Sequence, residues 1–450
     1  MNASGETLPG VSEASVAPLP AVERASPRAT HPWRWIPTLY FAQALPNVAV
    51  ATLSVVMYKN LGLANTDIAL YTSWLYLPWV VKPLWSPLVD LFGRKRGWTV
   101  ALQFVVGVAF ALVALSLPAP QFFRLTLAMF WLLAFASATH DIAADGLYML
   151  ALSEKRQAAF VGVRSTFFRL AMIAGQGALV VLAGLVYESN GSYVIAWQVV
   201  FSLLAALFLG AMLWHGFMLP RPASDRAAPR GGNPVAEFAS VFAAFFRKRE
   251  IATILAFLLL YRLAEAQLVK LAAPFLLDAR EQGGLGLTTA QLGIVYGSAG
   301  VAALTVGGIL GGLYIAGVGL KRALWPLLLA MHVPNLAYVA LAAWQPYSLW
   351  LVGTAVVVEQ FGYGFGFTAY MVYMLMVASQ DGAHRTAHYA LATGFMALGM
   401  MLPGMAAGWL QSLWGYTAFF VWVCIATLPS FVVAARLRID PAFGRRDAAT

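Results

Sequence analysis

The chain has 450 residues, of which 60% are hydrophobic and only 11% are charged. This composition excludes an ordinary soluble globular protein and indicates an all-α integral membrane protein. The formal net charge is +10, but the basic residues are spread along the loops between apolar segments, so we attribute the charge to membrane topology and expect no nucleic-acid partner.

Residues 1–32 are rich in Ala, Pro, Ser and Glu and contain no apolar signal, so we expect a disordered cytoplasmic tail. Apolar segments long enough to cross about 30 Å of hydrocarbon then recur along the chain. They predict twelve transmembrane helices, at Trp33–Lys59, Asp67–Phe92, Trp98–Leu117, Phe123–Leu152, Ala158–Tyr187, Tyr193–Leu219, Ile251–Asp278, Thr289–Ala316, Arg322–Ala343, Tyr347–Ala378, Ala387–Leu413 and Gly415–Arg436.

The basic residues alternate between the two sides of this arrangement. Of the 29 Lys and Arg, we place only Lys59, Arg124 and Arg280 on the outer side, and most of the others in loops on the opposite side. The positive-inside rule then puts both termini in the cytoplasm, including a C-terminal tail at residues 437–450. We expect a bacterial inner membrane location.

The longest internal loop, residues 220–250, separates helix six from helix seven as a polar cytoplasmic linker. The chain is thus predicted to form two six-helix bundles, residues 33–219 and 251–436. This organisation resembles the major facilitator superfamily, in which the solute site lies between two such bundles near the membrane midplane.

The loop after helix two also resembles a loop motif of that superfamily. It contains Asp90, Gly93, Arg94 and Lys95, with an acid at a helix end beside basic residues. These residues predict a gating latch that holds one conformation closed. The alternative is that the basic residues only follow the positive-inside rule.

Ionisable residues at membrane depth are costly and therefore mark candidate functional sites. Asp141 and Asp145 are spaced i, i+4 on one helix face, where two carboxylates cannot easily both be ionised, so they are candidates for proton coupling. A purely structural salt bridge with Arg164 or Arg169 of the next helix is the alternative. Lys270 is a weaker candidate, because its side chain can snorkel toward the membrane surface.

Helix seven places Arg262 and Glu265 at i, i+3, a spacing that allows either a coupling pair or a permanent ion pair. In helix ten, Glu359 shares a face with Tyr363 and Tyr370, and this acidic and aromatic stripe suits sugar binding unless it only packs. The expected proton-coupling residues are therefore Asp141, Asp145, Glu265 and Glu359, and the expected solute-binding residues are Gln43, Asn47, Lys82, Arg164, Arg262, Tyr363 and Tyr370.

The chain has no phosphate-binding loop and no common hydrolase or kinase signature, so we expect neither an ATP-driven pump nor an enzyme. Its one cysteine, Cys424, cannot form an internal disulfide or a cysteine metal site. No cofactor or metal is expected. Secondary transport of a small-molecule solute with protons by a monomer in the lipid bilayer fits best, with a membrane receptor or channel as the alternative class.

Five stretches identify a more specific resemblance: LYFAQALPN, VVKPLWSPLVDLFGRKRGW, ASATHDIAADG, LLYRLAEA and VVVEQFGYGFGFTAYMVYML. They resemble the AmpG-type muropeptide permeases and the related acetyl-coenzyme A transporters. The resemblance implies proton-driven import of anhydromuropeptides for cell-wall recycling, with Lys82, Asp141, Asp145, Arg262, Glu265 and Glu359 at charged sites of the family motifs. Siderophore importers are similar, so an iron chelate is the alternative solute.

Overall fold

The computed structural model describes residues 31–226, 234–380, 385–441 and 443–445, and the regular elements in these ranges are all helical. Helices suit a chain in hydrocarbon because they satisfy every interior backbone N–H and C=O without water. The predicted tail at residues 1–32 falls almost wholly outside the described residues, and so does the end of the predicted C-terminal tail.

The N-terminal half, which we define as residues 31–226, contains nine α-helices and three short 3-10 or π-helical segments. In chain order they are η1 Pro32–Arg34, α1 Ile36–Val48, η2 Ala49–Leu53, α2 Ser54–Asn60, α3 Asn65–Trp74, α4 Leu77–Leu91, α5 Lys95–Ser116, α6 Phe122–Ala151, α7 Glu154–Ile173, η3 Ala174–Leu179, α8 Val180–Asn190 and α9 Tyr193–Met218.

The C-terminal half, residues 251–445, follows a connecting helix, α10 Pro234–Phe246. Its elements are α11 Ile251–Leu260, α12 Leu263–Leu277, η4 Arg280–Gln282, α13 Thr289–Leu292, η5 Gly293–Gly300, α14 Val301–Val318, α15 Leu320–His332, η6 Val333–Asn335, α16 Leu336–Trp344, α17 Leu349–Ser379, α18 Arg385–Ile425 and α19 Leu428–Ala435.

Ten helical stretches within the described residues are long and apolar enough to cross a membrane. Nine of them match predicted segments, with ends that differ by no more than three residues. The agreement follows from the physics of the bilayer, because the length of an apolar run is a local property of the sequence.

The number of membrane-spanning stretches, ten, differs from the twelve predicted helices because of two regions of the chain. The predicted segment Asp67–Phe92 is divided into α3 and α4, and Pro78 at the second position of α4 suits the start of a new helix. The last two predicted segments form one stretch, Ala387–Ala435, which contains a non-helical residue at Gly415, with φ 72° and ψ 174°. Glycine tolerates this left-handed φ because it lacks a Cβ atom.

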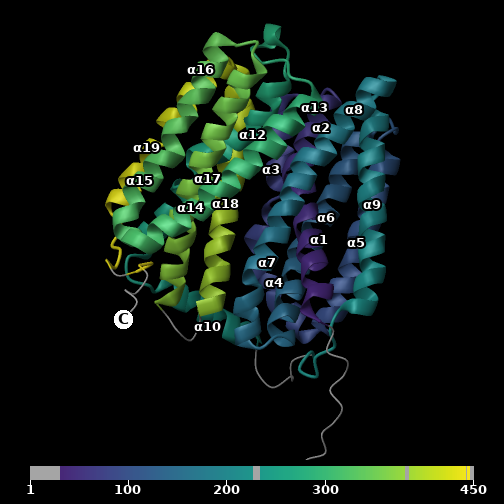
Figure 1. Ribbon diagram of the computed structural model, residues 1–450. Helices are drawn as coiled ribbons and strands as arrows, with labels where there is room; N and C mark the ends of the chain where they lie inside the picture. The colour runs from purple at the N-terminus through teal and green to yellow at the C-terminus, as the bar shows by residue number, and fades with distance from the viewer. Residues whose placement is uncertain (1–30, 227–233, 381–384, 442, 446–450) are drawn as a thin grey trace, which may run out of the picture.

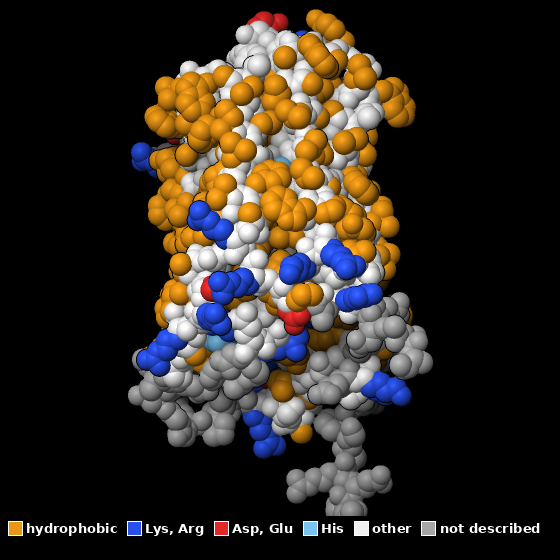
Figure 2. Space-filling model, turned by 90° about the vertical axis from the view of Figure 1, so that its left-hand side faces the viewer, with side chains coloured by type: hydrophobic (Ala, Val, Ile, Leu, Met, Phe, Trp, Pro, Cys, Tyr) orange, Lys and Arg blue, Asp and Glu red, His pale blue; other side chains and the backbone are white. Residues whose placement is uncertain are grey.

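The two halves lie side by side, with the N-terminal half on the right and the C-terminal half on the left of Figure 1. Helix α10 lies at the lower end, which we call the linker end, whereas α13 and α16 lie near the opposite end, which we call the far end. Figure 2 shows hydrophobic side chains over the upper and middle parts of one face, with Lys and Arg gathered toward the linker end.

Helix α10 lies within the linker that we expected to be polar. Its Phe245 is buried, with its ring centroid 6.1 Å from that of Phe395 and 5.4 Å from that of His388 in α18. The aromatic contacts attach this part of the linker to the C-terminal half. The prediction used the average composition of residues 220–250, which is polar, so it did not detect the short apolar run of α10.

Small residues allow close helix packing between the halves. Segment η3 packs against η5, and α8 packs against α13. A Cβ atom on Gly297 would collide with the backbone carbonyl of Gln176, and one on Gly184 would lie 2.8 Å from the Cα of Ala290. These backbones therefore approach as closely as glycine permits, as is common between membrane helices.

Candidate functional site

The two predicted acids of α6 each face a basic residue of a neighbouring helix. Arg164 of α7 lies with its Nη2 2.9 Å from Oδ1 of Asp145, and Lys82 of α4 lies with its Nζ 3.5 Å from Oδ2 of Asp141. The indole Nε1 of Trp79 is 3.4 Å from the same oxygen of Asp141. In this conformation, each carboxylate therefore has a counter-charge.

Aromatic rings fix the position of the Arg164 side chain. Tyr40 of α1 donates a 3.1 Å hydrogen bond to Oδ1 of Asp145, and its ring lies 4.5 Å from the guanidinium carbon of Arg164. The ring of Tyr148 lies 5.5 Å from the same carbon. A guanidinium over aromatic faces gains electrostatic attraction while its Nη2 still binds the carboxylate.

These charges are accessible although they lie well inside the helices. Asp145 is 36% exposed and Arg164 31% exposed, whereas Asp141 and Lys82 are 20% and 29% exposed. Asp141 lies ten residues before the end of α6, which is about 15 Å at the helical rise of 1.5 Å per residue. These four side chains are therefore not sealed off by the helices packed around them.

Arg262 of the C-terminal half does not bind Glu265, although the spacing allowed this ion pair. It is the residue before α12, where the chain turns between α11 and α12, and its Nη2 donates to the hydroxyl of Tyr363 in α17. Its guanidinium carbon lies 4.7 Å from the ring of Phe367 and 5.4 Å from that of Tyr363. The break in the helix turns the guanidinium toward α17.

Glu265 and Glu359 are fully buried, and neither forms an ion pair within the part of the chain that the structure describes. Both carboxyl oxygens of Glu265 and Oε1 of Glu359 have no hydrogen-bond partner, and Oε2 of Glu359 accepts one bond of 2.9 Å from Gln360. The two carboxyl groups interact electrostatically with each other and with Tyr296 and Tyr338, and Glu265 also interacts with the guanidinium of Arg262. Such unsatisfied buried oxygens are rare and costly, so this acidic pair is a strong functional candidate.

The predicted stripe of α17 divides into two environments. Tyr363 contacts Arg262, but Tyr370 is fully buried and donates a 2.6 Å hydrogen bond to the carbonyl of Leu258 in α11. A Cβ atom on Gly366 would lie 2.5 Å from the carbonyl oxygen of Leu327. This glycine therefore allows α17 to pack closely against α15.

The two polar candidates of α1 lie beside its proline. Gln43 is 6% exposed, and its Oε1 has no hydrogen-bond partner, whereas Asn47 is half-buried. Helix α1 continues after Pro46 as the π-helical segment η2, which accommodates the proline without ending the membrane span. These side chains stay candidates for solute binding.

The predicted gating loop binds an acid that sequence analysis did not identify. The carboxylate of Asp225, in the linker, accepts hydrogen bonds from the backbone N–H groups of Lys95 (2.7 Å) and Arg96 (3.1 Å) at the start of α5. Gly93 has a φ of 98°, which favours glycine in this turn, and Arg94 is exposed. The side chain of Asp90 lies outside the described residues, so the latch itself stays a prediction.

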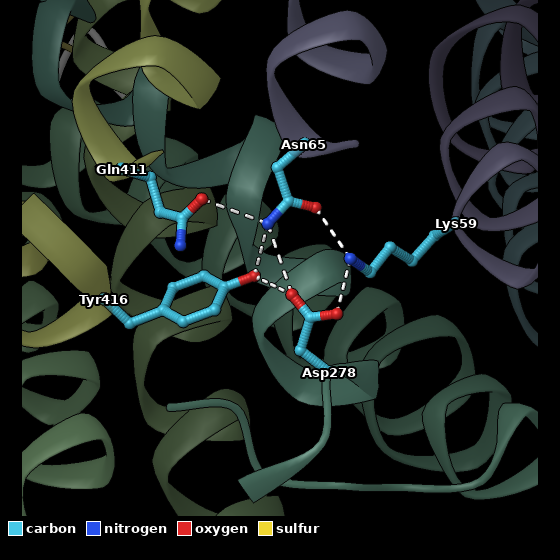
Figure 3. A network of polar contacts seen from close by, with 5 residues as sticks. All are labelled: Lys59, Asn65, Asp278, Gln411 and Tyr416. Carbon is cyan, nitrogen blue, oxygen red and sulfur yellow. Dashed lines mark hydrogen bonds and ion pairs between the residues drawn. The ribbon is translucent and has the colours of Figure 1, made fainter. Parts of the chain in front are cut away.

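A second group that sequence analysis missed joins the halves at the far end (Figure 3). Lys59 forms an ion pair with Asp278, and Asn65 donates to Asp278, to Gln411 and to the hydroxyl of Tyr416 at 3.2, 3.1 and 2.8 Å. Tyr416 donates to the same carboxylate at 2.5 Å. We call Lys59, Asn65, Asp278, Gln411 and Tyr416 the far-end network.

The far-end network had a faint signal in the sequence. Lys59 and Asp278 end the first and seventh predicted helices, and both were assigned to the same side of the membrane. Opposite charges at corresponding positions of the two predicted halves indicate a contact between them. The structure places both in a largely buried position, with side chains 15% and 7% exposed, so the contact closes this end.

His140 belongs to a buried chain of polar side chains inside the N-terminal half. His140 lies 3.1 Å from the amide nitrogen of Gln103, whose oxygen is 2.9 Å from Nδ1 of His215, and Nε2 of His215 is 2.9 Å from the hydroxyl of Thr38. The chain links α6, α5, α9 and α1. His140 of α6 therefore faces the neighbouring helix α5.

The fold and the match to a family model define the class of this protein. The model of the Major Facilitator Superfamily matches residues 38–385, and the chain belongs to that superfamily. Among solved structures, a bacterial homolog of the human lysosomal transporter Spinster, in an inward-facing and unoccupied conformation, has a TM-score of 0.65 at 17% identity, covering 89% of this chain and 94% of that one. The nucleoside transporter NupG (D323A mutant) has the same TM-score at 16% identity, covering 89% of this chain and 97% of that one.

Curated relatives narrow the resemblance to the AmpG-type permeases. The anhydromuropeptide permease of Escherichia coli (strain K12) is 27% identical over 404 residues, which covers 88% of this chain and 77% of that protein. A Rickettsia conorii protein that carries the AmpG name is 26% identical over 416 residues, which covers 88% of this chain and 94% of that one. The chain is thus similar to AmpG-type transporters over most of its length, as the five sequence stretches indicated.

Proposed function

We propose that the protein is a proton-coupled symporter that imports anhydromuropeptides across a bacterial inner membrane, as a monomer of two six-helix bundles (residues 33–219 and 251–436). Membership of the Major Facilitator Superfamily supports transport, and the name of the Escherichia coli relative supports the solute. The gathering of Lys and Arg toward the linker end supports a cytoplasmic position for that end and for both termini.

The observation that carries proton coupling is the unpaired acidic pair, Glu265 and Glu359. Asp141 and Asp145 face Lys82 and Arg164, whereas the acidic pair is fully buried and forms no ion pair within the described residues. Two neighbouring carboxylates that form no ion pair are costly to bury in ionised form. The guanidinium of Arg262 acts on Glu265 but can offset only one negative charge, so at least one of the two carboxyl groups holds a proton in this conformation. Release of that proton requires the pair to become hydrated.

Alternating access supplies the change in environment that coupling needs. In this conformation the far-end network is closed, while Asp141, Asp145, Lys82 and Arg164 are accessible. A solute carboxylate that binds Lys82 or Arg164 displaces Asp141 or Asp145, and each freed acid then gains from protonation. Gln43, Asn47, Arg262, Tyr363 and Tyr370 are proposed as further solute contacts, with Tyr370 reached only after α11 and α17 separate.

The experiment is uptake of labelled anhydromuropeptide into proteoliposomes under an imposed proton gradient. Wild type is expected to accumulate the solute, and Glu359→Gln to lose gradient-driven accumulation while keeping exchange of external for internal solute. Glu188→Gln is the matched control, because Glu188 is exposed at the end of α8. Glutamine keeps the size of the side chain and removes only its ability to carry a proton.

Each part of the proposal can fail separately. If wild type ignores anhydromuropeptide but accumulates a ferric siderophore, the solute assignment is wrong and transport stands. If the solute equilibrates without accumulation at any proton gradient, a channel replaces the symporter. If Glu359→Gln and Glu265→Gln both accumulate solute as wild type does, the acidic pair does not carry the coupled proton.

A further inference from the structure

Lys270 of α12 is a buried cation that sequence analysis treated as a minor candidate able to snorkel outward. The structure shows the opposite, because its side chain is 2% exposed. Its Nζ donates a 3.0 Å hydrogen bond to the hydroxyl of Thr72 in α3, and lies 4.9 Å from the centre of the Tyr76 ring. Lys270 therefore reaches across from the C-terminal half to the N-terminal half.

No ion pair neutralises Lys270 within the part of the chain that the structure describes. Lys82 and Arg164 each face an aspartate, but the contacts of Lys270 are a neutral hydroxyl and an aromatic face. One hydroxyl engages only one of the three N–H donors of an ammonium group. A buried ammonium with so little compensation is expensive, and such a residue inside a membrane span marks a function by default.

The seam around Lys270 is polar on the side of the N-terminal half. Ser73 of α3 is fully buried, and its hydroxyl has no hydrogen-bond partner. A Cβ atom on Gly404 of α18 would lie 2.8 Å from that hydroxyl and 3.2 Å from Cγ of Lys270. Helices α3, α12 and α18 thus meet here with unused hydrogen-bonding capacity.

The position of Lys270 along α12 places it between the acidic pair and the far-end network. It lies five residues after Glu265 and eight before Asp278, which is about 7.5 Å and 12 Å at 1.5 Å per residue. On the facing helix α3, Asn65 contacts Asp278, and Thr72 contacts Lys270. The same seam therefore carries two layers of contact between the halves.

We infer that Lys270 is an anion-binding residue of the far-end-open conformation, where it receives a carboxylate of the entering solute. Separation of α3 from α12 and α18 breaks the bond to Thr72 and leaves the ammonium group facing the opened pathway. The carboxylate replaces Thr72 as its partner, and closure of the seam returns Lys270 to Thr72 as the solute moves toward the linker end. This inference rests on the proposed function and adds a specificity residue to it.

The test compares uptake from the far end by wild type, Lys270→Gln and Lys270→Arg. The probes are anhydromuropeptide with free peptide carboxylates and the same compound with those carboxylates amidated. Loss of a charge-assisted hydrogen bond is expected to raise the KM of the acid about tenfold or more in Lys270→Gln, with the amide unaffected and Lys270→Arg close to wild type. An unchanged KM for the acid, or an equal rise for the amide, would overturn the inference.

A second measurement needs no solute and separates this inference from the proposed function. The thiol is introduced as Ser73→Cys in a protein that also carries Cys424→Ser and Asp278→Asn, the second of which is expected to open the far end. It is labelled in separate reactions with a negatively and a positively charged methanethiosulfonate. Lys270→Gln is expected to lower the ratio of negative to positive labelling rates several-fold, because it removes a positive charge beside the thiol. If wild type transports no muropeptide, a lowered ratio still supports an anion site in the pathway, and an unchanged ratio overturns it.

Discussion

Replacing Asp278 with asparagine is expected to open the far end of the transporter. Asp278 accepts an ion pair from Lys59 and hydrogen bonds from Asn65 and Tyr416, so its charge holds together groups from both halves (Figure 3). Asparagine has the same shape but no charge. The substitution leaves Lys59 as an uncompensated cation in a position where its side chain is only 15% exposed.

The magnitude follows from the burial of the pair. Removing one partner of a fully buried ion pair costs about 3 to 5 kcal/mol, and the partial exposure of Lys59 lowers this to about 2 kcal/mol. Opening of the far end hydrates Lys59 and removes this cost. The substitution therefore raises the free energy of the closed conformation only. A difference of about 2 kcal/mol shifts the equilibrium toward the far-end-open state by about 30-fold.

Thiol labelling from the far end measures this shift. Ser73→Cys in a Cys424→Ser background places a thiol behind the far-end network, where the side chain is now fully buried. A membrane-impermeant maleimide should label it faster in Asp278→Asn by about the shift in population. Asp67→Asn is the matched control, because Asp67 is exposed in the first turn of α3.

Unfolding has to be distinguished from opening. A thiol at Ser137, buried inside the N-terminal half, should stay unlabelled in every variant if the fold is intact. An unchanged labelling rate at Ser73→Cys in Asp278→Asn, with Ser137→Cys protected, would refute the reasoning that the ion pair holds the far end closed. A variant that also replaces Lys59 with methionine removes the stranded charge and should label more slowly than Asp278→Asn.

Three further substitutions test other parts of the structure. Gly297→Ala forces a Cβ atom into the backbone of η3 and should abolish uptake in a proteoliposome assay, whereas Gly162→Ala, with open space around it, should leave uptake unchanged. Asp225→Ala removes the acceptor at the start of α5 and should cost about 1 kcal/mol, seen as a lower melting temperature in detergent. Asp145→Asn leaves Arg164 without its counter-charge and should also lower the melting temperature, while proton-driven accumulation persists through the acidic pair. If Asp225→Ala and Asp145→Asn melt at the same temperature as wild type, the expected losses of stability are contradicted.

Much of the candidate site was predictable as a set of residues but not as a set of contacts. The sequence identified Arg262, Glu265 and Tyr363 as polar groups at membrane depth, and helical spacing suggested a pair between Arg262 and Glu265. The structure pairs Arg262 with Tyr363 instead, because the chain breaks between α11 and α12 and turns the guanidinium toward α17. Periodicity assumes a continuous helix, so it could not give this orientation.

The sequence by itself determined the membrane class and the ends of nine spans, because each depends on the apolar length and charge of a local segment. Only the tertiary structure decided which charges are neutralised and which are not. Arg164 meets Asp145, Lys270 meets a hydroxyl of the opposite half, and the carboxylate of Glu265 has no hydrogen-bond partner. Such partners are set by how helices distant in sequence approach one another, and a difference of a few ångströms in that approach changes an ion pair into an unpaired charge.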